Sequence, residues 1–224
     1  MSNWDVGKVK DFTGMFQGSN NAGDMKLREL DVSGWNTESA TKMGWMFYGC
    51  SQLQEIAVDN WQVEKVTEFS HMFADCYSLK SLNTSNWDTL SVKTFDAFLN
   101  DCHGLTTIDV SGLETATCTQ FSQMFESCVN LEEIVGLDKW DTSNASHYAF
   151  SETFNGCSKL TYLDLSAWNT SNADNMARMF AGCCGLRELD LSGWNVEKVE
   201  TMVAMFEGCS EELEIVGTDG MRKT

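Results

Sequence analysis

The chain lacks several features that an ordinary globular protein of its size has. It contains no proline in 224 residues, so none of its turns depends on the fixed φ of that residue. Basic residues are scarce: 15 Lys and Arg stand against 33 Asp and Glu, and the net charge of -18 argues against binding to nucleic acid or to an anionic membrane. No apolar run approaches the roughly 18 residues that span a bilayer. The nine cysteines are an odd number, which excludes a fully paired disulfide framework within one chain.

A segment of about 26 residues is repeated along the chain. It is clearest in Leu160–Cys183, LTYLDLSAWNTSNADNMARMFAGC, and in Leu186–Cys209, LRELDLSGWNVEKVETMVAMFEGC. Eight copies align on the position three residues before the cysteine, which we call the anchor column: Phe16, Phe47, Phe73, Leu99, Phe125, Phe154, Phe180 and Phe206. All 13 phenylalanines lie in this column or in two others, one and four residues before it. A fixed period of this length indicates a solenoid, in which equivalent residues stack from coil to coil.

The spacing within each copy predicts one helix and one strand. Met176, Met179, Phe180 and Cys183 have the spacing of the apolar stripe of a short amphipathic helix. The segment Leu163-Asp164-Leu165 alternates apolar and polar residues, which is typical of a half-exposed strand. The fold prediction is therefore α/β: a right-handed leucine-rich repeat solenoid of about eight coils, with one parallel sheet and short helices on the opposite side. Residues 1–224 are expected to form a single domain.

Departures from the 26-residue period predict where the loops lie. About five extra residues lie around Ser19 to Lys26, and three are split across Gly136 to Phe150; both belong in loops at the edge of the stack. The sequence begins within a repeat and neither end shows an obvious polar cap, so we expect a piece of a longer repeat array. The first residues are not typical of a signal peptide.

The consensus L-x-x-L-D-L-S-x-W-[ND]-[TV]-x-x-V-x-x-M-x-x-M-F-x-G-C resembles the BspA-type leucine-rich repeats over essentially the whole chain. Those repeats are found in surface proteins and lipoproteins of bacteria and in surface proteins of some protists. The resemblance implies an extracellular or cell-surface location, adhesion or binding to a protein, and no catalysis.

The cysteines allow three interpretations. Zinc binding would require paired ligands, and the sequence offers only Cys183-Cys184 and Cys102-His103. Disulfides between neighbouring coils are possible on distance alone. The interpretation we favour is that seven cysteines in one column, and Cys118 in another, are small apolar core residues, whereas Cys184 is accessible. We expect no metal site and no cofactor.

The histidines form no catalytic constellation. His71, His103 and His147 occupy unrelated repeat positions, and we expect them to lie at the surface. The sequence contains no Gly-rich phosphate loop and no convergent nucleophile and base. The chain is therefore predicted not to be an enzyme.

The outward positions of the predicted strands form the candidate binding site. This surface, which we call the strand face, is acidic with apolar residues in the middle, and its candidate residues are Glu29, Asp31, Glu55, Asp59, Asp109, Glu133, Val135, Leu137, Tyr162, Asp164, Glu188 and Asp190. Solenoids commonly bind ligands through extended surfaces of this kind. We expect a protein partner with basic patches, no nucleic acid and no insertion into membranes, with an oligomeric state that the sequence leaves open.

Two alternatives remain at this point. The chain could be a structural repeat segment of a larger surface protein. It could also be an ice-binding solenoid, because a file of Thr and Val lies two residues after the tryptophan position of each copy: Val6, Thr37, Val63, Thr89, Thr115, Thr142, Thr170 and Val196. Ice binding would require two such files on a flat face, with a spacing matched to ice, and only one file is clean here.

Overall fold

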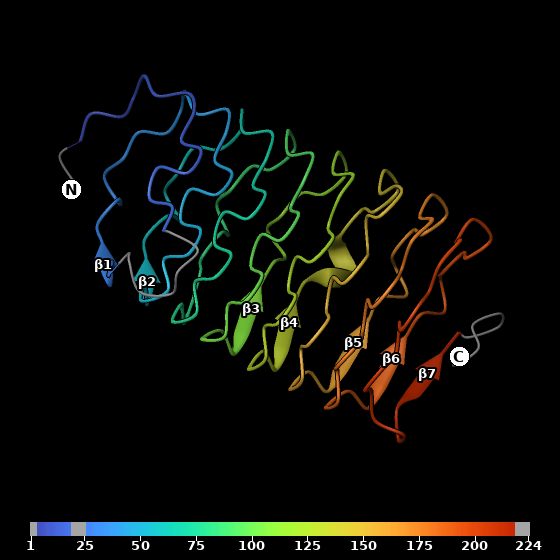
Figure 1. Cartoon of the computed structure of the whole chain (residues 1–224). Coiled ribbons are helices and arrows are strands. Elements are labelled where there is room, and N and C mark those ends of the chain that lie inside the picture. The colour runs from blue at the N-terminus through green and yellow to red at the C-terminus, as the bar shows by residue number, and fades with distance from the viewer. Residues whose placement is uncertain (1–3, 19–25, 218–224) are drawn as a thin grey trace.

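The computed structural model describes residues 4–18 and 26–217. The coils follow one another in a single row, with one short strand in most coils and all strands on the same side (Figure 1). The elements are β1 (Glu29–Leu30), β2 (Glu55–Ile56), β3 (Thr107–Asp109), β4 (Glu133–Val135), the 3-10 helix η1 (Leu137–Lys139), β5 (Tyr162–Asp164), β6 (Glu188–Asp190) and β7 (Glu214–Val216). A leucine-rich-repeat-like stack with short parallel strands is confirmed.

The strands pair in parallel and in sequence order, but they do not form the single sheet predicted. Three sheets are present in the described residues: β1 with β2, β3 with β4, and β5 with β6 and β7. Between β4 and β5 the chain turns at Gly136, whose φ of 96° is left-handed, and enters η1. This diversion falls within the predicted insertion after Gly136, and it interrupts the ladder there.

The predicted helices are absent from the described residues, and this part of the fold prediction is wrong. Residues 176–183 form successive tight turns, such as the one closed by the Met179 amide on the Met176 carbonyl at 3.3 Å. The intervening amides donate to the next coil instead, as Phe180 does to the Met205 carbonyl at 3.0 Å. Arg178 and Gly182 have left-handed φ values of 55° and 71°, which an α-helix does not allow. Some of the backbone amides therefore form their hydrogen bonds with the neighbouring coil. In an α-helix the same amides would bond to carbonyls within the helix.

The core consists of aromatic columns that run along the stack. Phe154 stacks on Phe180 with ring centroids 5.7 Å apart and an angle of 2° between the planes, and Phe180 stacks on Phe206 at 5.7 Å and 6°. The tryptophans form a parallel column, in which Trp35 and Trp61 lie 6.0 Å apart at 3°. The stacking of equivalent residues, coil on coil, is therefore confirmed for the aromatic columns.

Polar side chains bind these columns together by hydrogen bonds between coils. Each thiol of the cysteine column donates to the anchor carbonyl of the preceding coil, as Cys157 does to Phe125 at 3.0 Å. Thr142 is buried, donates to the Asn169 carbonyl at 3.1 Å and accepts from the Asn169 amide at 2.7 Å. The thiol adds a second hydrogen bond to a carbonyl that already accepts from an amide of its own coil, as Phe125 does from Cys128 at 3.1 Å, whereas Thr142 pairs with both the amide and the carbonyl of Asn169.

The two predicted loops have different outcomes. Residues 19–25 of the first insertion lie outside the described residues. The second insertion contains η1 and a turn that carries Tyr148, which is exposed. In the described residues, no helix has the length and apolar character that a membrane crossing would require.

Candidate functional site: the strand face

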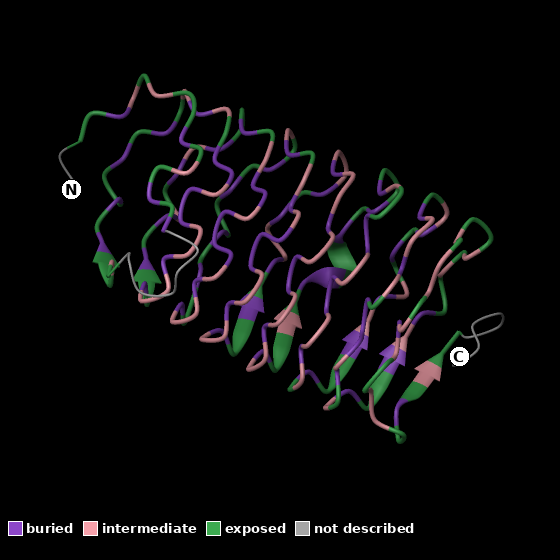
Figure 2. Cartoon of the chain, viewed as in Figure 1, coloured by how far each residue is buried: buried purple, intermediate pink, exposed green. Residues whose placement is uncertain are grey.

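The structure brings the predicted site residues together on one side of the stack. Each strand begins with an exposed residue, and the residue that follows is buried in β1, β2, β3, β5 and β6 and half-buried in β4 and β7 (Figure 2). Eight of the twelve candidates are exposed and three are half-buried: Glu29, Asp31, Glu55, Asp109, Glu133, Val135, Tyr162 and Glu188 in the first group, and Asp59, Asp164 and Asp190 in the second. Tyr162 is 55% exposed and Val135 is 43% exposed, so both present apolar surface on this face.

Leu137 is the candidate that the structure contradicts. It is only 4% exposed and belongs to the core, and its carbonyl accepts a hydrogen bond from Nε1 of Trp168 at 3.1 Å. In the other coils this bond is made by the second inward residue of the strand segment, such as Leu165 with Trp194 at 2.9 Å. The left-handed turn at Gly136 moves Leu137 into that inward position, so the apolar centre of the strand face consists of Val135 and Tyr162.

Carboxylates on the strand face lie opposite one another on adjacent strands. Glu29 pairs in register with Glu55, and Glu188 pairs with Glu214. Asp164 pairs with Asp190 in the same way. Like charges directly opposite one another destabilise a sheet by about 0.2–1 kcal/mol per pair. The face therefore carries an unfavourable concentration of negative charge that a cationic ligand would relieve.

The aspartates after the strands have a structural role that the sequence analysis did not assign to them. Oδ1 of Asp164 accepts from the amide and the hydroxyl of Ser166, at 3.0 and 2.6 Å. Asp109 accepts in the same way from the Ser111 amide at 2.9 Å. These hydrogen bonds lower the pKa of both aspartates. These two aspartates thus stabilise the turns that follow β3 and β5. The better candidates for contact with a ligand are the exposed glutamates that begin five of the strands, which we call the glutamate file: Glu29, Glu55, Glu133, Glu188 and Glu214.

Two hollows lie on the strand face. The first, of about 490 Å³, lies over β1, β2 and the segment Ser81–Asn83. The second, of about 280 Å³, lies between β4 and β5 and is lined by residues that include Ile134, Leu137, Asp138 and Tyr162. The second hollow exists because η1 interrupts the sheet there, and it places an aromatic ring, an apolar wall and a carboxylate side by side.

A second polar cluster was missed by the sequence analysis. It lies on the side of the stack formed by the tight turns around the anchor column, which we call the turn side. The carboxylate of Glu126 accepts from Nδ2 of Asn100 and from Nδ2 of Asn155, both at 3.0 Å, and bridges three coils. Burial, followed by the nearby charge of Glu152, raises the pKa of Glu126 to about 7. The residues after the anchor column vary from coil to coil, so no recurring pattern marked this cluster.

Each histidine lies near an aspartate, and two of the three are less exposed than predicted. His147 is exposed, with Nδ1 3.0 Å from Oδ2 of Asp174. His103 is half-buried, with Nε2 3.1 Å from Oδ1 of Asp101. His71 is also half-buried, and burial lowers its pKa although the nearby charge of Asp96 opposes this.

The cysteines and the Thr/Val file test the other interpretations of the sequence, namely metal binding, core thiols and ice binding. No cluster of three or more His, Cys, Asp or Glu with metal-binding geometry occurs in residues 4–18 and 26–217. Burial of the column cysteines is confirmed for all except Cys209, which is half-buried, and Cys118 is also buried; Cys184 is exposed as predicted. The Thr/Val file is buried from Val6 to Thr170 and half-buried at Val196, so it forms no exposed face. The observation that suggested ice binding is thereby removed.

The geometry defines a leucine-rich-repeat-like coil stack with an acidic strand face. A family model described as "Mycoplasma protein of unknown function, DUF285" matches residues 1–56, 21–134 and 98–215. These matches together extend over nearly the whole sequence, and the chain belongs to this family. No curated protein matches the chain.

Several solved structures are similar to the chain at low identity. A leucine-rich repeat protein from Eubacterium ventriosum is 24% identical, with a TM-score of 0.45, over 69% of this chain and 36% of that one. A leucine-rich repeat protein from Bacteroides ovatus is 18% identical, with a TM-score of 0.37, over 77% and 51%. A leucine rich cell surface protein from Faecalibacterium prausnitzii is 16% identical, with a TM-score of 0.42, over 88% and 62%. The chain thus spans less than two thirds of each of these structures, and at these scores the likeness does not extend to a ligand or a location.

Proposed function

We propose that the chain is a non-enzymatic binding module that recognises a basic segment of a partner protein through the strand face. The observation that supports this most is the pairing of carboxylates in register, Glu29 with Glu55 and Glu188 with Glu214. The two negative charges of such a pair repel each other and destabilise the fold. A cationic ligand bound between them would be attracted to both and would reduce this repulsion. The net charge of -18 adds long-range steering of a basic partner.

The apolar centre of the face supplies the anchoring contact in this proposal. Tyr162 stands at the edge of the hollow between β4 and β5, and Val135 lies on β4. Aromatic side chains at the centre of an interface commonly contribute most of the binding energy, with charged residues around them. A partner segment with an apolar side chain flanked by Lys or Arg would match this arrangement.

The resemblance of the repeat to BspA-type leucine-rich repeats suggests the cellular location at which this binding takes place. Adhesion to a host or neighbouring protein at the cell surface is the role that the resemblance implies, and we include it in the proposal. Antibody labelling of intact cells of the native organism is the measurement that tests the location. Labelling that requires cell lysis would contradict it.

Binding to a displayed peptide library at low and high salt tests the proposed function. The variant carries Glu→Gln at the exposed strand positions Glu29, Glu55, Glu133 and Glu188. A matched control with the same charge change carries Glu→Gln at exposed residues away from the strand face, namely Glu38, Glu64, Glu114 and Glu197. We expect enrichment of Lys- and Arg-containing peptides, weakened by salt and by the strand-face variant but much less by the control.

A second variant tests the apolar anchor. Tyr162→Ser should reduce affinity for the same peptides by tenfold or more, the loss typical of a central aromatic contact. If the strand-face variant and the control bind equally well, or if no basic peptides are enriched, this surface is not the binding site.

A further inference from the structure

The strand side of the stack is open at one place in its interior, between β4 and β5. Among the described strands, β4 pairs with β3 alone and β5 with β6 alone. The left-handed turn at Gly136 and the 3-10 helix η1 follow β4 directly. Coils continue on both sides of the opening, so it belongs to the interior of the stack (Figure 1).

Backbone groups of β5 face this opening. The amide and the carbonyl of one strand residue point to one side, and those of the next residue point to the other side. The Leu165 amide donates to the Asp190 carbonyl of β6 at 2.9 Å, so the preceding residue, Asp164, directs its backbone groups toward β4, as does Tyr162. In the described part of the chain, neither residue forms a backbone hydrogen bond to β4. Two carbonyl oxygens are therefore available to a donor that enters the opening.

The side chains around the opening combine an aromatic ring, an apolar wall and two carboxylates. They surround the hollow of about 280 Å³ and include Ile134, Leu137, Asp138, Tyr162, Leu163 and Asp164. Asp138 is exposed and has no hydrogen bond or ion pair with another described side chain. Asp164 accepts both of its hydrogen bonds from Ser166 through Oδ1, which leaves Oδ2 open to another donor.

The charges near the hollow favour a cation. Partial desolvation, followed by the nearby charges of Asp164 and of two β6 carboxylates, raises the pKa of the Tyr162 hydroxyl. The neighbouring basic residue Lys139 lies near Asp109 of β3 and offsets the negative charge there. The face of the Tyr162 ring adds a surface on which a planar cation can stack.

The size and the chemistry of the hollow match one arginine side chain. Its volume is just below the range of about 300–1,000 Å³ that is typical of pockets for drug-sized ligands, so it accommodates a single side chain rather than a folded surface. Arginine offers several N–H donors on a planar cation that stacks on aromatic rings, and an aliphatic stem that packs on apolar surface. Lysine has the stem and the charge, but it lacks the planar group.

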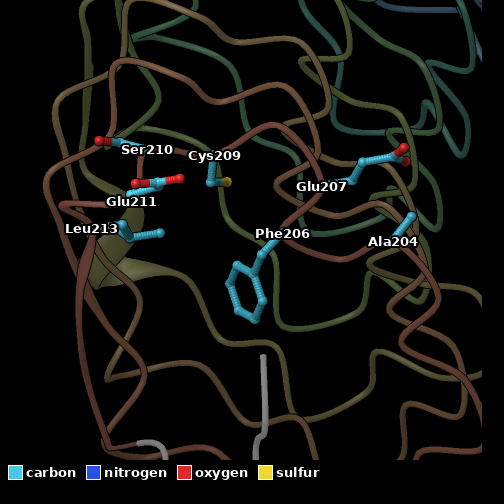
Figure 3. Close-up of a pocket in the computed structure, with 7 residues that line it drawn as sticks. All are labelled: Ala204, Phe206, Glu207, Cys209, Ser210, Glu211 and Leu213. Carbon is cyan, nitrogen blue, oxygen red and sulfur yellow. The ribbon is translucent and has the colours of Figure 1, made fainter. Parts of the chain in front are cut away.

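Two other hollows lack this combination. The hollow over β1 and β2 has carboxylates but no aromatic ring in its lining. The hollow beside Phe206, of about 620 Å³, lies over the last described coil and opens onto the core columns, with Glu207 and Glu211 at its rim (Figure 3). The hollow between β4 and β5 thus differs from both in having an aromatic ring on the strand face.

From these observations we infer that the hollow between β4 and β5 binds the side chain of an arginine residue in the partner segment. The stem of the arginine packs on Ile134 and Leu137. Its guanidinium group stacks on Tyr162, and it donates to Asp138 and to the backbone carbonyls that face the opening. This inference rests on the proposed function and names the residue that the strand face selects, because the glutamate file attracts Lys and Arg alike.

Titration with N-acetyl-arginine amide, followed through backbone amide resonances in NMR spectra, tests this inference without a partner protein. We expect shifts concentrated at Gly136, Tyr162 and Asp164. The affinity should be about threefold or more above that of N-acetyl-lysine amide, because stacking on an exposed ring adds to the charge attraction. N-acetyl-citrulline amide, which has nearly the same shape but no charge, should cause no shifts at these residues.

Variants at two exposed positions test the two contacts. Asp138→Asn should weaken binding of the arginine derivative about threefold, in keeping with an exposed charge pair. Tyr162→Leu should weaken it by a similar factor, whereas Tyr162→Phe retains the ring and should bind as the wild type does. Glu64→Gln, an equal charge change away from the strand face, is the control and should leave binding unchanged. The unfolding transition of each variant shows whether the fold is retained.

The outcomes separate this inference from the proposed function. Equal binding of the arginine and lysine derivatives overturns the inference, as do shifts spread over the whole strand face or shifts at the hollow that Asp138→Asn leaves unchanged. If the peptide library enriches basic peptides while the arginine derivative does not shift the hollow, the proposed function stands and this inference fails. A library without enriched basic peptides removes both.

Discussion

Replacing Phe154 with alanine removes a ring from the middle of the anchor column. Phe154 is fully buried and stacks on Phe125 at 5.7 Å and on Phe180 at 5.7 Å, and its ring also lies 6.1 Å from that of Trp168. A buried Phe→Ala change typically costs about 3–5 kcal/mol of unfolding free energy, and each aromatic pair contributes about 0.5–1.5 kcal/mol of specific interaction. We expect Phe154→Ala to lie at the upper end of that range, because it breaks contacts with the coils on both sides.

Phe206→Ala is the matched control in the same column. Phe206 is half-buried, and Phe180 is its one stacking partner among the described rings. Its removal should cost about half as much, roughly 1.5–2.5 kcal/mol. Urea unfolding followed by tryptophan fluorescence measures both changes, and a lower m-value for Phe154→Ala would show that the stack has split into separately unfolding parts. Equal losses for the two variants would refute the reasoning that stability is passed from coil to coil through this column.

Four further predictions follow from individual contacts. Iodoacetamide at pH 8 should modify Cys184 rapidly and the buried thiols only after denaturation, because burial raises the pKa of Cys128, for example, to about 12; fast labelling of seven or more cysteines would contradict this. The raised pKa of Glu126 means that the folded state binds its proton more tightly than the unfolded state does, so this group's contribution to stability falls as the pH rises from about 4.5 to about 7. Glu126→Gln should therefore stabilise the protein by about 1 kcal/mol at pH 8 but not at pH 4, since solvent screens part of the charge, and an equal effect at both pH values would exclude this cause. Glu188→Gln should raise the unfolding free energy by a few tenths of a kcal/mol, and added salt should remove the difference. The native protein should produce no thermal hysteresis in a freezing assay, because its Thr/Val file is not exposed.

The repeat and its inward columns were predictable from the sequence because stacking requires the same side chain at the same position in every coil. Phe47 on Phe73 and Trp35 on Trp61 are examples, and the stacked pairs are separated in sequence by the period of the repeat. The cysteine column was predictable for the same reason, although its hydrogen bond to the anchor carbonyl was not.

The helices were wrongly predicted because two backbone structures bury the same apolar spacing. A helix and a series of tight turns both return the chain to the core at intervals of three and four residues. The left-handed residues that distinguish the turns include Gln123 and Arg178, side chains with no special preference for that conformation. Tertiary hydrogen bonds between coils, rather than local sequence, select the turns here.

The strand face was predictable in its position but not in every residue. Alternation placed Glu55 and Tyr162 correctly on the outside. Leu137 was misplaced because the turn at Gly136 changes which residue points inward, and the position of an insertion within a repeat cannot be fixed by counting alone. The Asx-type hydrogen bonds of Asp109 and Asp164 depend on turn geometry that the alignment did not specify.

Distances between spin labels on the glutamate file test the stacked arrangement most directly. Labels at Glu55 and Glu133 are three coils apart, those at Glu55 and Glu188 five, and those at Glu55 and Glu214 six. With about 4.8 Å per coil, the account predicts separations of ~14, ~24 and ~29 Å, which increase linearly with the number of coils. Separations that do not increase with coil number, or that place Glu55 as close to Glu214 as to Glu133, would contradict it.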